Sequence, residues 1–120
     1  MRRVFASALA LLLFGLTGSA EAACHVVRWR SVWGVETTAY METDGAVCRT
    51  SVSRVWNTSE VHSVNIASPP RSGSASAAGR SVTYRPRPGF KGEDSFVFAI
   101  VGRKAGSPQR GTVRVNVTVR

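Results

Sequence analysis

The chain has few of the groups that catalysis and metal binding require. Its 120 residues include two histidines, two cysteines and seven acidic residues. Neither His25 nor His62 lies near a nucleophile motif, and with the two cysteines they match no standard spacing of zinc ligands. Glycine-rich phosphate loops and redox thiol pairs are also missing from the sequence. The sequence therefore predicts that the protein is not an enzyme and uses neither a metal nor a cofactor.

Long apolar runs are scarce as well. The longest, VFASALALLLFGL, is too short to span a bilayer comfortably, follows an arginine pair, and precedes a small-residue pattern that ends at Ala22. This arrangement predicts a secretory signal peptide over residues 1–22. A lipid-anchored start at Cys24 would favour an aliphatic residue where Glu21 stands. We therefore expect a single mature domain, residues 23–120, without a transmembrane segment, in the periplasm or outside the cell.

The two cysteines lie in the part that would be exported, where the compartment is oxidising. We therefore expect a disulfide between Cys24 and Cys48. Closing a loop of about 25 residues contributes roughly 3 to 4 kcal/mol in the chain-entropy model.

Negative charge is the next scarcity. After the expected cleavage the chain carries 12 Arg and 2 Lys against 4 Glu and 2 Asp, a formal net charge of +8. A basic exported protein suits anionic partners such as lipopolysaccharide, wall polymers, acidic glycans or nucleic acid. The alternative is that the arginine content reflects genomic composition and solubility.

What the mature chain does have is alternation of apolar and polar residues, without a helical period of useful length. Four valines occupy every second position of residues 112–120, which predicts a strand with one buried face. Residues 95–101 are apolar on both faces and predict a central strand. Further strands are expected over residues 24–33, 35–43, 46–52, 61–67 and 80–84.

The connections between these strands are short and rich in turn residues. Asp44-Gly45 is a hairpin signal, and residues 68–79 and 102–111 are expected to be loops. About seven strands in a chain of this length predict an all-β fold, a single immunoglobulin-like antiparallel β-sandwich.

The stretch YRPRPGFKGEDSF, residues 84–96, concentrates turn chemistry in one connection. Prolines keep the residues before them extended, glycines can adopt positive φ, and a carboxylate can accept backbone N–H groups. These features predict a stiff structural crossover between the two sheets, with an aromatic side chain entering the core from either side. Its residues are Tyr84, Pro86, Pro88, Gly89, Phe90, Gly92, Asp94 and Phe96.

With the valine-rich end of the chain, these residues resemble the C-terminal half of bacterial immunoglobulin-like, cadherin-like β-sandwich repeats. Those repeats read Tyr-x-Pro, then Pro-Gly-Phe-x-Gly-x-Asp-x-Phe, then a closing valine-rich strand. The resemblance covers roughly residues 60–120. It implies a seven-stranded sandwich of the kind found in exported surface or adhesion proteins.

One set of residues suggests a binding surface. If the strands follow immunoglobulin order, the loops at residues 43–45, 68–79 and 102–111 share one end of the sandwich. We expect an anion-binding surface there, made by Arg71, Arg80, Arg103, Lys104 and Arg110. The alternative is a set of solvated loop arginines.

Two classes of function follow. The first is an exported, non-enzymatic module that contacts cell-envelope components or another protein. The second is a small basic protein that binds an anionic polymer through its loop arginines. Nucleic acid is disfavoured because Trp29 and Trp33 alternate with Arg28 and Arg30, which puts aromatic and basic side chains on opposite faces.

Overall fold

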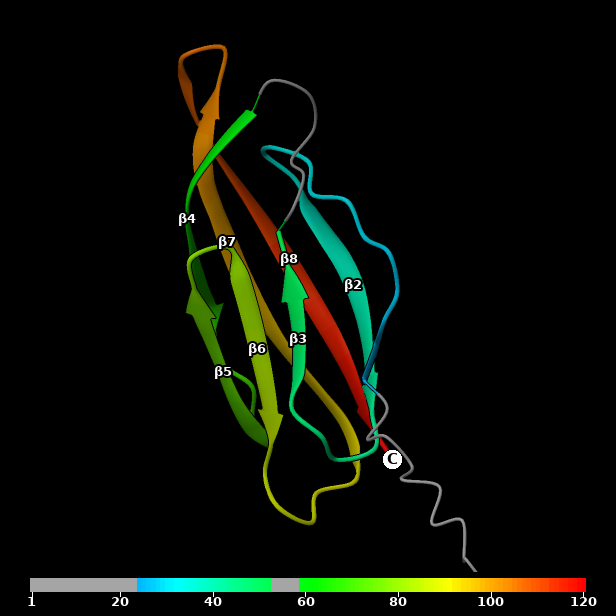
Figure 1. The fold of residues 1–120 in the computed structure, drawn as a ribbon. Coiled ribbons are helices and arrows are strands. Elements are labelled where there is room, and N and C mark those ends of the chain that lie inside the picture. Colours follow the sequence, from blue (N-terminus) through cyan, green and yellow to red (C-terminus); the bar gives the residue numbers. More distant parts are fainter. Residues whose placement is uncertain (1–23, 53–58) are drawn as a thin grey trace, which may run out of the picture.

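The computed structural model describes residues 24–52 and 59–120, and its eight strands there form two packed sheets (Figure 1). The five-stranded sheet has the order β1 (Cys24–Val26), β2 (Glu36–Thr43), β8 (Ser107–Val119), β7 (Gly92–Lys104), β4 (Ser59–Ser68). The three-stranded sheet has the order β3 (Cys48–Ser51), β6 (Ser81–Pro86), β5 (Gly73–Ala78). The signal peptide expected over residues 1–22 lies outside the described residues.

The expected immunoglobulin-like sandwich is confirmed. The order β3-β6-β5 matches the B-E-D sheet of an immunoglobulin domain, and β8-β7-β4 matches G-F-C. In this correspondence β2 is the first strand of the immunoglobulin set, and β1 is an additional short strand at its edge. Among residues 24–52 and 59–120, no helix is long and apolar enough to cross a membrane.

Alternation builds the core as expected. The four valines of β8 face inward and are at most 3% exposed, and β7, which is paired on both edges, contributes Phe96, Phe98 and Ile100. From the opposite sheet, the ring of Tyr84 stacks on Phe96 with centroids 5.8 Å apart. The predictions for residues 95–101 and 112–120 are thus confirmed.

The prediction of a hairpin at Asp44-Gly45 is wrong. β2 runs parallel to β8, from Glu36 opposite Thr112 to Thr43 opposite Val119, while β3 joins the other sheet. The turn is therefore a corner between sheets. Gly45 supplies a φ of 114°, and the Thr43 hydroxyl both donates to Ala46 and accepts from the Gly45 amide.

Two expected loops contain strands. Residues 73–78 form β5, and residues 102–111 form the tip of the β7–β8 hairpin, whose turn is Ala105-Gly106 alone. Glycine, serine and alanine have low strand propensity, so β5 owes its conformation to pairing with β6 rather than to its own sequence.

The strand expected over residues 24–33 is confirmed only as β1, and an irregular segment follows it. This segment covers the end of the large sheet near the β7–β8 hairpin. Trp29 packs edge-on against Phe98 with centroids 5.5 Å apart. Further along, β7 and β8 have glycines on their inner face. A Cβ at Gly102 would collide with the backbone carbonyl of Glu60 and would also meet Trp33, and a Cβ at Gly111 would lie 2.9 Å from the Ser31 Oγ.

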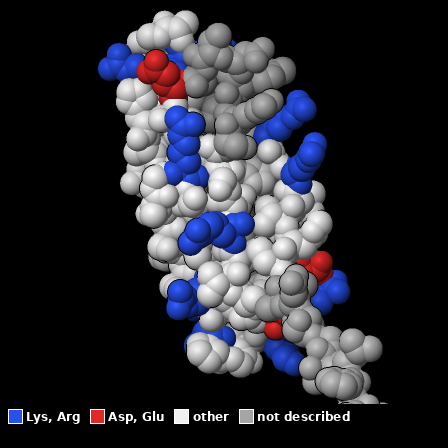
Figure 2. All heavy atoms as spheres, in the orientation of Figure 1, with Lys and Arg blue, Asp and Glu red and all other residues white. Residues whose placement is uncertain are grey.

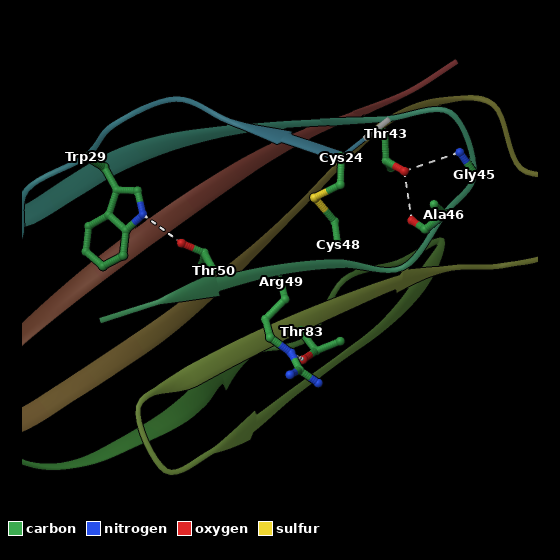
Figure 3. Close-up of a disulfide and its surroundings, with 9 residues drawn as sticks. All are labelled: Cys24, Trp29, Thr43, Gly45, Ala46, Cys48, Arg49, Thr50 and Thr83. Atoms are coloured by element: carbon green, nitrogen blue, oxygen red, sulfur yellow. Dashed lines mark hydrogen bonds between the residues drawn. A yellow bond between two sulfur atoms is a disulfide. The ribbon is translucent and has the colours of Figure 1, made fainter. Parts of the chain in front are cut away.

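The expected disulfide between Cys24 and Cys48 is present, with the two Cα atoms 5.3 Å apart (Figure 3). It joins edge strand β1 of the large sheet to edge strand β3 of the small sheet. Near the other end of β3, the indole N–H of Trp29 donates to the Thr50 hydroxyl at 3.2 Å. These two contacts hold the N-terminal segment beside β3.

The crossover between β6 and β7 has the structure expected of residues 84–96. Phe90 N–H donates to the Arg87 carbonyl at 3.0 Å around a Pro88-Gly89 pair, and Gly89 has a φ of 79°. This proline-then-glycine order is that of a type II turn. Gly92 also has a positive φ, 136°, where β7 begins.

Candidate anion-binding face

The structure separates the five basic residues that were expected to form one surface. Arg71 lies near the end of β8 that contains Val119, since its amide donates to Asp94, which is opposite Val117. Arg103, Lys104 and Arg110 belong to the β7–β8 hairpin at the other end of β8, which spans roughly 40 Å. The expectation that these loops share an end is therefore wrong.

The β7–β8 hairpin does bring three of the basic residues together, but next to an acidic neighbour. Arg103 is opposite Pro108, and Arg110 is opposite Val101, so the two arginines are diagonal neighbours. Glu60 of β4 is directly opposite Arg103 in the sheet. Arg80 lies apart from this group, in the turn between β5 and β6.

The acidic residues show where negative charge is concentrated. In the described chain all of them lie in β2, in the turn after β2, in β4 or in β7, and so none lies in the small sheet. Glu36 pairs with Arg114 at 3.1 Å, and Glu42 pairs with Arg120. Two of the carboxylates of the large sheet are thus paired with arginines of β8 or of the residue that follows it.

The outer surface of the small sheet carries arginines and hydroxyl groups instead. Figure 2 shows Lys and Arg side chains from one end of this face to the other, with acidic groups at its margins. Because side chains alternate along a strand, the outward positions of three strands meet in rows such as Arg49, Thr83 and Ser76. We call this surface the arginine–hydroxyl face; its residues are Arg49, Ser51, Ser74, Ser76, Ser81, Thr83 and Arg85.

Arg49 occupies the middle of the face. Its side chain points away from the disulfide and donates from Nε to the Thr83 hydroxyl at 3.4 Å (Figure 3). This contact orients the guanidinium without neutralising it, and leaves its other N–H groups available. Neither Arg49 nor Arg85 has a carboxylate within ion-pair distance among the residues that the structure describes.

A shallow hollow of about 300 Å³ lies at the end of the face where β5 begins and β6 ends. Arg71, Arg85 and Arg87 line it, together with glycine, serine and proline residues. Arg87 is held over the Phe90 ring, with its guanidinium carbon 6.0 Å from the ring centroid. Three cations thus surround a space whose other walls are glycine, serine and proline residues.

This arrangement is suited to binding and has the chemistry of anion recognition. Guanidinium groups present fixed N–H donors that match carboxylate, sulfate or phosphate oxygens, and hydroxyl groups can donate beside them. In residues 24–52 and 59–120, no three His, Cys, Asp or Glu side chains lie close enough to hold a metal ion. The histidine His62 is exposed and contacts Glu60 at 3.4 Å.

Sequence analysis missed Arg49 and Arg85 as site residues. Arg49 lies in the strand expected over residues 46–52, whereas Arg85 lies one residue beyond the strand expected over residues 80–84, which the structure extends to Pro86. The alternation shows that each faces away from its apolar neighbours. It does not show that the two strands pair, which is what places the arginines on one surface.

No protein-family model matches the chain, and no curated protein is significantly similar to it.

Proposed function

We propose that this chain is an exported, non-enzymatic immunoglobulin-like binding module of the bacterial cell envelope or its surroundings, and that it holds an anionic partner on the arginine–hydroxyl face. The observation that carries the proposal is the separation of charge between the sheets. The acidic residues lie on or beside the large sheet, and the small sheet has arginines without acidic neighbours in the described chain. The resemblance to immunoglobulin-like, cadherin-like repeats supports a role in contact rather than in catalysis.

The chemistry of the face suggests how the partner is bound. Unpaired guanidinium groups attract negative charge over several ångströms, and sulfate or carboxylate groups can then replace water on their N–H donors. The serine and threonine hydroxyls add short-range hydrogen bonds. A partner with regularly spaced anionic groups, such as lipopolysaccharide, an acidic glycan or an acidic protein segment, meets both requirements.

Heparin binding tests the proposal. A double variant, Arg49→Ser with Arg85→Ser, removes two charges from the face. Since each lost anionic contact flattens the salt dependence of polyanion binding by roughly one unit in log–log slope, we expect the slope to fall by about one to two. The variant should elute from heparin at a clearly lower salt concentration than the unaltered protein.

The matched control removes two charges elsewhere. Arg103→Ser with Lys104→Ser changes the net charge equally, but at the β7–β8 hairpin. We expect it to elute close to the unaltered protein. Equal losses for the two variants, or a larger loss for the hairpin variant, would show that net charge or the hairpin governs retention, and the proposed face would be wrong.

A further inference from the structure

The edge of β5 differs from the other sheet edges in the described chain. β1 has three residues, and β4 has register shifts at Val61/Ser63 and at Ile66/Ser68. β3 is flanked by the disulfide and by the Trp29–Thr50 hydrogen bond. Short length, bulges and covering groups are the devices by which proteins keep edge strands from pairing with other chains. β5 has none of these within Gly73–Ala78, and it contains neither charge nor proline.

The hydrogen-bond register shows which backbone groups of β5 are open. Arg87 N–H donates to the Ser72 carbonyl at 2.9 Å, so residues 72 and 87 form a hydrogen-bonded pair. Such pairs alternate along an antiparallel ladder, and the next position, Gly73 opposite Pro86, cannot be one because proline lacks an N–H. The N–H and C=O groups of Gly73, Ala75 and Ala77 therefore point away from β6, toward the open edge.

Arginines stand at both ends of this open edge. The hollow lined by Arg71, Arg85 and Arg87 lies where β5 begins, and Arg80 follows where it ends. Arg85 of β6 is opposite Ser74 of β5, so Ser74 lies between Arg85 and the open edge. A serine is short enough for the Arg85 side chain to extend over it toward a strand placed beyond β5.

We propose that β5 is the docking edge for an extended acidic peptide segment, which adds to the small sheet as a fourth strand. The inference rests on the anionic partner of the proposed function and specifies its class. Main-chain hydrogen bonds to Gly73, Ala75 and Ala77 provide the pairing, as in other cases of strand addition. Acidic side chains on the outer face of the added strand then meet Arg71, Arg85 and Arg87, and the six residues of β5 accommodate about six residues of the partner.

Charge favours this occupant over a second copy of the chain. Pairing β5 with the β5 of another copy would bring two basic faces together, whereas an acidic strand neutralises the arginines at the edge. The length of β5, roughly 20 Å, is sufficient for specific pairing with a short peptide.

An eight-residue peptide of alternating Thr and Glu, fluorescently labelled, is a suitable probe, because all of its carboxylates lie on one face when it is extended. Two derivatives carry N-methyl groups, either on every Thr or on every Glu. Only one set of N–H groups faces β5, the Thr set in an antiparallel complex and the Glu set in a parallel one. We expect the unmodified peptide to bind, one derivative to bind at least tenfold more weakly, and the other to bind normally. Equal binding of all three peptides would mean attraction by charge alone and would overturn the inference.

The variant Ala75→Pro tests the edge from the protein side. It removes an outward N–H without breaking the bonds to β6, so peptide binding should weaken at least tenfold while heparin retention stays unchanged. If the variant does not fold, the comparison of the N-methylated peptides on the unaltered protein still tests whether the peptide pairs with β5. If the unaltered protein does not bind heparin, the proposed function is contradicted. If it binds heparin but binds the N-methylated and unmodified peptides equally well, only strand addition is contradicted. A dimer of the unaltered protein that Ala75→Pro makes monomeric would assign the edge to a second copy and overturn the peptide as its occupant.

Discussion

Asp94 shows how one side chain fixes the connection between the sheets. Its carboxylate accepts from the amides of Arg71, Ser72 and Ser95 and from the Tyr84 hydroxyl, at 2.8 to 3.0 Å. The sequence predicted a carboxylate that accepts backbone N–H groups at the start of a strand, and this is confirmed. It could not predict that two of the donors lie more than 20 residues earlier, because that contact depends on how the loop after β4 packs against β7.

The same contact makes the stability of the protein dependent on pH. Burial first, and then the hydrogen bond to Asp94 and its negative charge, raise the pKa of the Tyr84 hydroxyl above its ordinary value. Tyrosine in the unfolded chain ionises near pH 10. Above about that pH the unfolded state binds fewer protons than the folded state, so the free energy of unfolding falls as the pH rises. Below it, the stabilisation from Tyr84 is complete.

We therefore expect Tyr84→Phe to lower stability at pH 7 but to reduce the alkaline loss. Above pH 10 the free energy of unfolding of the unaltered protein should fall faster than that of the variant, by at most about 1.4 kcal/mol per pH unit. Urea denaturation between pH 8 and 11.5 measures both. Tyr40→Phe, at a position that is 56% exposed, controls for loss of a phenol elsewhere. Parallel stability profiles for the unaltered protein and Tyr84→Phe would contradict the predicted role.

At the scale of elements, periodicity predicted strands whose own residues determine their burial. β7 and β8 were predicted from phenylalanines and valines at alternate positions, and both are confirmed. β5 was not predicted, because its pairing with β6 outweighs the low strand propensity of its small residues. The Asp44-Gly45 signal also failed, since both edges of β2 are already paired, one with β8 over eight residues and the other with β1, while β3 pairs with β6.

The β7–β8 hairpin contains a correctable strain. Its two turn residues, Ala105 and Gly106, have φ values of 48° and 80°, which is the pattern of a type I′ turn. Alanine is unfavourable in the left-handed region, whereas asparagine and glycine enter it at lower cost. We expect Ala105→Asn to raise the free energy of unfolding by about 0.5 to 1 kcal/mol. A thermal melt measures the gain, and Ala78→Asn, at an exposed strand position without positive φ, is the control.

At the scale of the whole molecule, the arginine–hydroxyl face is a product of topology. Arg49, Thr83 and Ser76 come from three separate segments, and each is ordinary in its own segment. They meet because β6 pairs with β3 on one side and with β5 on the other. The sequence indicated an excess of positive charge and an anionic partner, but it placed the charge in loops. Only the order of the strands shows that arginines also gather on the outer face of the small sheet.

The disulfide connects the two sheets at one edge of the sandwich, so its removal should weaken the domain as a whole. Cys24 is exposed, and Cys48 is fully buried in the core. Cys24→Ser therefore breaks the bond while leaving the core side chain in place, and we expect it to lower the free energy of unfolding by about 3 kcal/mol. Urea denaturation of the oxidised protein measures this loss. Dithiothreitol should reduce the stability of the unaltered protein to the level of Cys24→Ser and should not affect the variant further. A variant as stable as the oxidised protein would show that the Trp29 contact with Thr50 suffices to hold the N-terminal segment against β3.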